Sequence, residues 1–198
     1  MDAYAALYDR FYDDPKRRPQ VEAKIKAAID SLPVWCRLDL LMTLAKSAWA
    51  HTDRAAAIEL LHRAQRMTDA HQWPPRYGLP LKARLVALRA QVGDPQKARA
   101  EADAALTWFD AVRHQMVDID RAGALRPLAE AYQSMGDSAT ALAVYRRVVD
   151  EGVVNPNSRP NAQDLSATCL SMATHGVEPD EALWARMRQI HKALGPPW

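Results

Sequence analysis

The chain has 198 residues, of which 48% are hydrophobic and 25% are charged, and its formal net charge is only +2. This length suits one ordinary domain, and the charge lacks the basic excess that is typical of nucleic-acid-binding proteins. No window of about 18 apolar residues predicts a membrane span, and the first residues lack the basic segment and apolar run of a signal peptide. We therefore expect a cytoplasmic protein whose partners are neither nucleic acid nor membrane.

The chain is predicted to be all-α, because no stretch alternates apolar and polar residues over the length of a strand. Residues 1–33 are expected to form two N-terminal capping helices. In the first, Tyr4, Tyr8 and Tyr12 recur at every fourth residue, which places them on one face of a helix. The second covers residues 20–29, with proline-containing breaks on both sides.

Residues 34–195 are predicted to form four helical hairpins, at about 34–75, 76–118, 119–159 and 160–195, followed by a tail at 196–198. Each hairpin turns at a short corner, where glycine can end one helix in the left-handed conformation and aspartate can cap the next. The four corners are Thr52-Asp53, Gly93-Asp94-Pro95, Gly136-Asp137 and Gly176 with Glu178-Pro179. In the third hairpin, Pro127 predicts a first helix that either begins near Ala124 or is kinked at the proline.

A near-constant interval supports a repeat. The small residue just inside the second helix of each hairpin is Ala57, Ala98, Ala141 or Ala182, and these alanines are 41, 43 and 41 residues apart. In a repeat of this kind, each hairpin buries its apolar face on its neighbours.

The third hairpin carries a family signature. Its residues Leu128 to Tyr132, Gly136-Asp137, Ala141-Leu142 and Tyr145 closely resemble the tetratricopeptide repeat (TPR), and the other hairpins resemble it less completely. The period of about 42 residues is similar to that of the longer TPR-like repeats of kinesin light chains and bacterial regulatory arrays. The resemblance implies an α-α superhelix, a right-handed solenoid of helical hairpins, and it says nothing about the ligand.

In such a solenoid, the first helix of each hairpin lines the concave side, where ligands usually bind. Helical projection gives ten candidate partner-binding residues on that side. They are Met42, Lys46, Trp49, Arg84, Gln91, Arg126, Glu130, Gln133, Thr174 and His175. Three of them, Lys46, Arg84 and Arg126, are either scattered solvated cations or a cationic clasp for an acidic peptide or a terminal carboxylate.

No pattern predicts a catalytic, metal or cofactor site. The chain has no phosphate-binding glycine loop, nucleophile elbow or zinc-ligand spacing, and its two cysteines, in the first and fourth hairpins, are expected to be separate thiols. One cluster leaves an alternative open. Asp110, His114 and Asp118 are spaced four residues apart and would share one helix face, either as a solvated surface or as a site for a divalent cation.

We therefore predict a non-enzymatic scaffold that binds a protein or peptide in the concave groove. The alternative is a regulatory or sensor module that binds a small ligand there, as part of a larger signalling or transcription-regulating system. A metal-dependent enzyme and an RNA-binding repeat are weaker hypotheses. The terminal Pro196-Pro197-Trp198 is expected to dock either on its own domain or on a second copy, as a homodimer.

Overall fold

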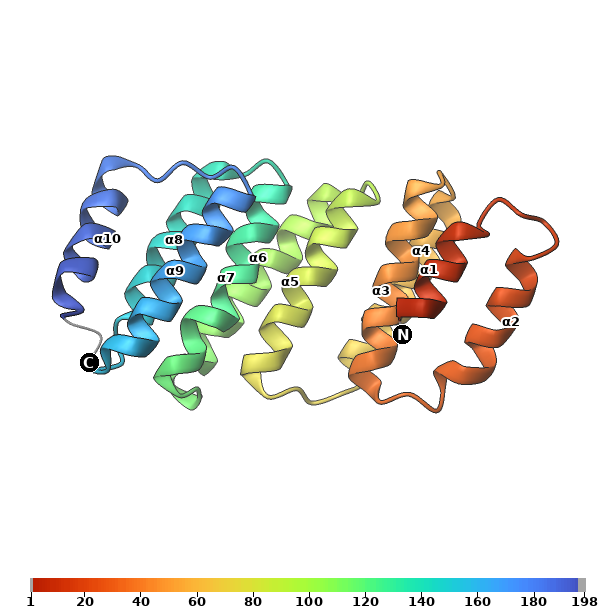
Figure 1. Cartoon of the computed structure of the whole chain (residues 1–198), viewed down its shortest axis with the longest axis horizontal. Coiled ribbons are helices and arrows are strands. Elements are labelled where there is room, and N and C mark those ends of the chain that lie inside the picture. The colour runs from red at the N-terminus through yellow and green to blue at the C-terminus, as the bar shows by residue number, and fades with distance from the viewer. Residues whose placement is uncertain (1, 196–198) are drawn as a thin grey trace. The chain divides into compact units, whose positions relative to one another are not determined.

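A computed structural model describes residues 2–195, and the predicted docking of the tail at 196–198 lies outside the described residues. The described chain contains ten α-helices, one short 3-10 helix and no strand (Figure 1). The all-α prediction is therefore confirmed. None of the helices in this described part is long and apolar enough to cross a lipid bilayer.

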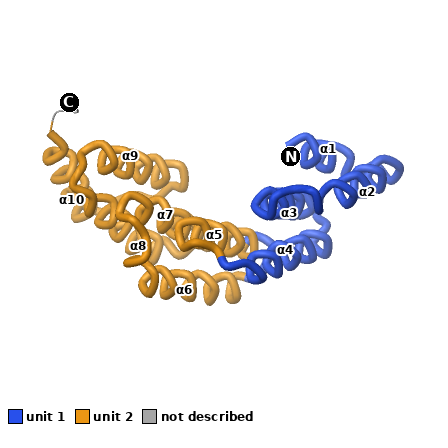
Figure 2. Tube along the Cα trace, turned by 90° about the horizontal axis from the view of Figure 1, so that it is seen from below, with its two compact units in different colours: residues 1–72, 91–94 blue, residues 73–90, 95–198 orange. Residues whose placement is uncertain are grey.

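The chain divides into two compact units (Figure 2). Unit 1 comprises residues 1–72 and 91–94, and unit 2 comprises residues 73–90 and 95–198. The helices of unit 1 are α1 (Asp2–Arg10), α2 (Arg18–Ile29), α3 (Val34–Ala50) and α4 (Arg54–Asp69). Those of unit 2 are α5 (Pro75–Gln91), α6 (Pro95–Val112), α7 (Asp118–Ser134), α8 (Ser138–Gly152), α9 (Ser158–Thr174) and α10 (Glu181–Ala193), with the 3-10 helix η1 (Arg113–Gln115) after α6.

In unit 1, α2 buries the apolar face that its sequence predicts, whereas α1 ends at Arg10, so Tyr12 lies beyond the helix that was expected to carry it. Tyr8 and Tyr12 are buried, and so are Val21, Ile25 and Ile29 of α2. Helix α1 packs on both α2 and α3, and α3 packs on α4. The two N-terminal helices therefore cover apolar surface that the α3–α4 hairpin would otherwise expose.

Unit 2 has two layers of helices, with α5, α7 and α9 in one layer and α6, α8 and α10 in the other (Figure 2). Their facing sides form one continuous core, in which Phe109, Leu125, Tyr132 and Tyr145 are fully buried. Alanines such as Ala98 and Ala141 are 0% exposed, since a small residue lets neighbouring helices approach closely.

The corners follow one design in both units. Gly136 has a φ of 79°, and the backbone N–H of Asp137 donates to the carbonyl of Tyr132 over 3.0 Å, which completes a Schellman motif. Asp137 then caps α8 by accepting from the backbone N–H of Thr140 over 3.1 Å. In the first hairpin, Thr52 takes the glycine's place with a φ of 62°. This conformation is costly for a β-branched residue.

The fourth hairpin corrects two predictions. Its Schellman bond comes from Val177, and the N-cap of α10 is Asp180, three residues later in the sequence. This longer corner shifts the register of α10, so Ala182 is exposed and Leu183 is the buried residue. On α9, Leu170 is 69% exposed.

Helix α7 begins at Asp118 and contains Pro127 in its interior, so the predicted start near Ala124 is wrong. A proline there removes one intrahelical hydrogen bond, which would be donated to the carbonyl of Gly123. Both glycine and proline weaken a helix, and here they fall within one turn. The surrounding packing of α7, whose residues Leu125 and Leu128 are buried, maintains the helix through this turn.

Candidate functional site

The ten predicted partner-binding residues are divided between the two units. Met42, Lys46, Trp49 and Gln91 belong to unit 1, and the other six belong to unit 2. The side chain of Met42 is only 2% exposed, so it is a core residue and its prediction as a contact residue is wrong. Lys46 and Gln91 are exposed, and Trp49 is half-buried. In unit 2, Arg84, Thr174 and His175 are exposed.

Arg126 is bound within the fold instead of facing a ligand. Its guanidinium donates to Asp164 of α9 over 3.1 Å and to the hydroxyl of Thr168 over 3.3 Å. Burial raises the pKa of Asp164, and Arg126 opposes this shift by favouring the charged carboxylate. Because the charge of Arg126 is neutralised by Asp164, the predicted cationic clasp loses one of its three members.

Glu130 has the same role one turn further along α7. Its carboxylate accepts from the hydroxyl of Ser171 over 2.6 Å, and that hydroxyl also contacts the phenol oxygen of Tyr145 over 2.7 Å. Gln133 buries its side-chain oxygen without a hydrogen-bond partner among the described residues. Arg126 and Glu130 of α7 thus bind side chains of α9 within the fold, and the role of Glu130 in partner binding stays a prediction.

The helix that was expected to carry Asp110, His114 and Asp118 is interrupted. Helix α6 ends at Val112, His114 lies in η1, and Asp118 is the first residue of α7. The chain becomes extended at Met116, whose side chain is buried. Asp110 pairs instead with Arg147 of α8. In the part of the chain that the structure describes, no group of three acidic, histidine or cysteine side chains could hold a metal ion.

The two cysteines are free thiols, as expected. Cys36 is half-buried in unit 1, and the sulfur of Cys169 lies 3.8 Å from that of Met187 in unit 2. Burial raises the pKa of Cys169, which keeps its thiol protonated and unreactive.

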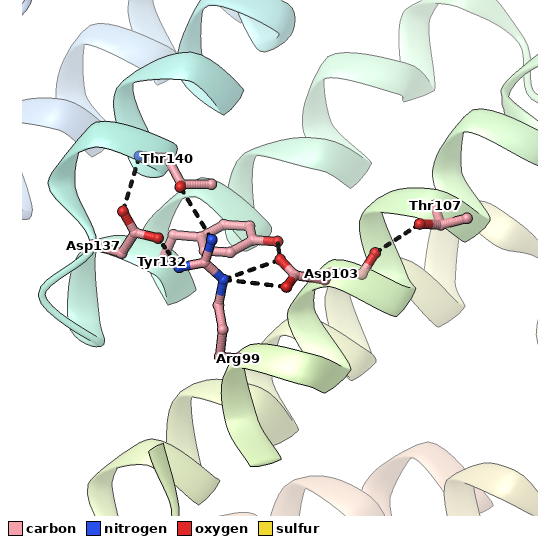
Figure 3. Close-up of polar contacts among 6 residues, drawn as sticks. All are labelled: Arg99, Asp103, Thr107, Tyr132, Asp137 and Thr140. Carbon is pink, nitrogen blue, oxygen red and sulfur yellow. Dashed lines mark hydrogen bonds and ion pairs between the residues drawn. The ribbon is translucent and has the colours of Figure 1, made fainter. Parts of the chain in front are cut away.

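A polar network joins α6 to the α7–α8 corner (Figure 3). Arg99 of α6 binds Asp103 on its own helix over 3.1 Å and reaches Asp137, the N-cap of α8. The phenol of Tyr132 donates to Asp103 over 2.7 Å, while the guanidinium of Arg99 lies 5.2 Å from the centre of the tyrosine ring. Burial and the neighbouring Asp103 raise the pKa of Tyr132, so its hydroxyl remains a donor.

Unit 1 repeats this arrangement with different helices. Tyr12 donates to Asp53, the N-cap of α4, over 2.9 Å. Arg18 of α2 pairs with the same carboxylate over 3.2 Å and lies 3.9 Å from the centre of the Tyr12 ring. The capping pair α1–α2 therefore contacts its neighbour with the same residue types that one hairpin of unit 2 uses to contact the next.

Ion pairs between neighbouring helices are common in the second layer of unit 2. They connect α8 to α6 on one side and to α10 on the other, with sequence separations of 34 to 38 residues. The pairs are Arg99–Asp137, Arg147–Asp110, Arg146–Asp180 and Arg186–Asp150. These separations are shorter than the repeat period of about 42 residues, so the period did not predict the pairs.

Large apolar side chains gather at the end of unit 2 where α7 begins and α8 gives way to α9. We define the apolar edge as Tyr77, Val117, Ile119 and Val154, which are 52%, 58%, 51% and 50% exposed. Two polar contacts, made by residues next to the edge residues in the sequence, connect the start of α7 to α5 and to the loop between α8 and α9. Arg76 pairs with Asp120 over 3.5 Å, and Asn155 donates to Asp118 over 3.1 Å.

A hollow of about 780 Å³ lies beside this edge, between α9 and the end of α10. It begins at Ser158, four residues after Val154, and includes Arg159 and Gln163 of α9 with Leu194. Sequence reasoning missed both the edge and the hollow. It searched helix faces, whereas the edge residues lie at helix starts and in a loop.

Comparison with known proteins gives no relative for this chain. No family model matches the sequence, and no curated protein or solved structure matches it. The TPR resemblance therefore rests on the residues of the chain itself.

Proposed function

We propose that this chain is a TPR-like interaction scaffold that binds a protein partner at the apolar edge of unit 2. The observation that carries the proposal is the exposure of four large apolar side chains, each at least 50% accessible, at one end of the unit. Contiguous exposed apolar surface with a polar rim is typical of protein interaction sites. Here Arg76, Asp118 and Asp120 supply polar groups around the edge.

The partner favoured by this surface is a protein segment with apolar side chains. Burying the exposed half of each edge residue contributes about 1 kcal/mol at ~25 cal/mol per Å². Tyr77 combines an apolar ring with a hydroxyl, and tyrosine is among the residues that dominate binding energy at interfaces. Tyr77 and Ile119 lie in the first turns of α5 and α7, which limits the entropy that these two residues lose on binding.

Affinity capture with matched variants tests the proposal. The double variant Ile119→Asp with Val154→Asp places two charges in the edge. Trp184→Asp makes the same change at another exposed apolar residue, on α10, where the side chain is 45% exposed. We expect the proteins retained by the native chain to be lost from the double variant and kept by Trp184→Asp. Equal retention by all three chains, or equal loss from both variants, would contradict the proposal.

The small-ligand alternative is favoured by the 780 Å³ hollow beside α9, which is large enough for a drug-sized molecule. Ala162 lines this hollow, so Ala162→Trp would fill it without adding charge to the apolar edge. If the hollow is the functional site, this variant loses a bound small molecule and keeps its protein partners. If the edge is the functional site, Ala162→Trp captures the same proteins as the native chain.

A further inference from the structure

A second hollow lies in unit 1, among α2, α3 and α4, and has a volume of about 430 Å³. Its floor is apolar and comes from all three helices. The apolar residues that line it include Ile25, Ile29, Leu41, Leu44 and Leu60. Tyr8 of α1 also contributes to the lining. The hollow is distinct from the apolar edge, which belongs to unit 2.

Some of the charged side chains at the rim of this hollow form ion pairs, and others do not. Arg18 pairs with Glu22 over 2.8 Å, and Glu59 pairs with Arg66 over 3.1 Å. Two further rim cations, on α2 and α4, have no ion-pair or hydrogen-bond partner among the described residues. These are Lys26 and Arg63. Both rim charges without a partner are therefore positive, which favours an anionic ligand.

The backbone of the lining helices restricts the ligand class further. Residues of α2, α3 and α4 make up almost the whole wall, and the N–H and C=O groups inside a helix bond to one another. An extended peptide in this hollow would leave its own amide groups without backbone partners, and each such group costs free energy when buried. A ligand with an apolar body and a single charged group has no such cost.

The volume sets the length of that apolar body. At about 30 Å³ for each non-hydrogen atom, the share of a water molecule in the liquid, 430 Å³ holds about 14 such atoms. A saturated carboxylate of about ten carbons fills most of this space and places its charge at the rim.

We propose that unit 1 binds a medium-chain aliphatic carboxylate. The chain packs on the apolar floor around Leu41, Leu44 and Leu60, and the carboxylate binds at the rim that carries Lys26 and Arg63. The long cationic side chains reach the carboxylate from two different helices, so the bound anion links α2 to α4. This site is independent of the proposed scaffold function, because its ligand and its unit are different.

Calorimetric titration of the full chain with decanoate, below its micelle concentration, tests the site. We expect saturable binding of one decanoate per chain. The double variant Lys26→Gln with Arg63→Gln should weaken this binding at least about tenfold, because hydrogen bonds to charged groups are the stronger class. Lys24→Gln removes an exposed cation of the same helix that does not line the hollow, and it should leave the affinity unchanged.

Two further measurements separate the parts of the proposal. Decanol has the same chain without the charge, so it should bind at least about tenfold more weakly than decanoate. Ala56→Trp fills the hollow from α4 and should abolish binding, while circular dichroism checks that this variant keeps its helices. Absence of saturable binding, equal affinity for decanol, or full affinity in the Lys26→Gln, Arg63→Gln chain would overturn the proposal. Capture of proteins at the apolar edge would be unaffected by any of these outcomes.

Discussion

Replacing Gly78 with alanine tests how closely α5 packs against α6. A Cβ atom at this position would lie 2.9 Å from Cη2 of Trp108 and 3.0 Å from Cβ of Trp73. A Cβ atom almost never lies closer than 3.0 Å to another heavy atom, so the indole ring of Trp108, which is rigid, would have to shift as a whole. Gly123, inside α7, is the matched control, because a Cβ there meets no atom within 4 Å.

Two opposing effects determine how much Gly78→Ala changes the free energy of unfolding. Alanine is favoured over glycine inside a helix by about 1 kcal/mol. Overpacking a filled site costs about 1–3 kcal/mol. We therefore expect Gly78→Ala to lower the free energy of unfolding by ~0–2 kcal/mol. At Gly123 only the favourable effect operates, so Gly123→Ala should raise it by about 0.5–1 kcal/mol.

Thermal and urea unfolding, followed by circular dichroism, measure the difference between the two variants. In a chain of this size, 1 kcal/mol corresponds to about 2–4 °C in Tm, so the Tm of Gly123→Ala should exceed that of Gly78→Ala by several degrees. An equal gain in both variants would refute the reasoning. It would mean that Trp108 moves away from α5 without cost.

Three other changes test the corners and the repeat register. Ala141→Leu should destabilise the chain by about 1–3 kcal/mol because it overpacks a fully buried site. Ala182→Leu, on the exposed side of α10, should change Tm little. Equal effects of the two variants would mean that Ala182 is buried as the sequence predicted. Thr52→Gly should raise the free energy of unfolding by about 0.5–1 kcal/mol. Relief of the strained left-handed backbone at this residue outweighs the backbone entropy that glycine adds to the unfolded chain. A lower urea midpoint in this variant would argue against the strain. Hydrogen bonds from the side chain and backbone of Thr140 lower the pKa of Asp137 in the folded chain. Its carboxylate therefore stabilises the fold above the ordinary aspartate pKa of about 3.9, and this contribution is lost as the pH falls through the lowered value. Urea unfolding of Asp137→Asn at pH 7 and pH 3 should show a gap from the native chain that closes in acid, and a gap independent of pH would exclude the charge as its cause.

Local signals were sufficient to predict the corner of the third hairpin. Its corner, Gly136-Asp137, contains both the left-handed residue and the cap, and each acts through atoms only a few residues away. The same local signals failed in the fourth hairpin. There Val177 donates the hydrogen bond that ends α9, and Asp180, three residues later, caps α10. A corner three residues longer changes which residue of α10 is buried, and helical periodicity alone cannot register that insertion.

Contacts between residues far apart in the sequence account for the other wrong predictions. Helical spacing placed Arg126 on the predicted concave side of α7, but it could not show that Asp164 of α9 accepts its charge. The spacing of Asp110 and His114 predicted a shared helix face, because no local signal indicates that α6 ends at Val112. The hollow of unit 1 needs three helices to form, so no single segment predicts it.

The ion pairs along α6, α8 and α10 bear on how a chain of this kind can lengthen in evolution. Helix α8 pairs with α6 through Arg147 and with α10 through Arg146, so it offers complementary charges to both neighbours. Exposed pairs of this kind add little stability, at most about 1 kcal/mol each, but they favour the correct neighbour in the correct register. A duplicated hairpin that inherits these charges would meet a matching surface on either side, and tandem duplication could extend the array without redesigning the existing interfaces.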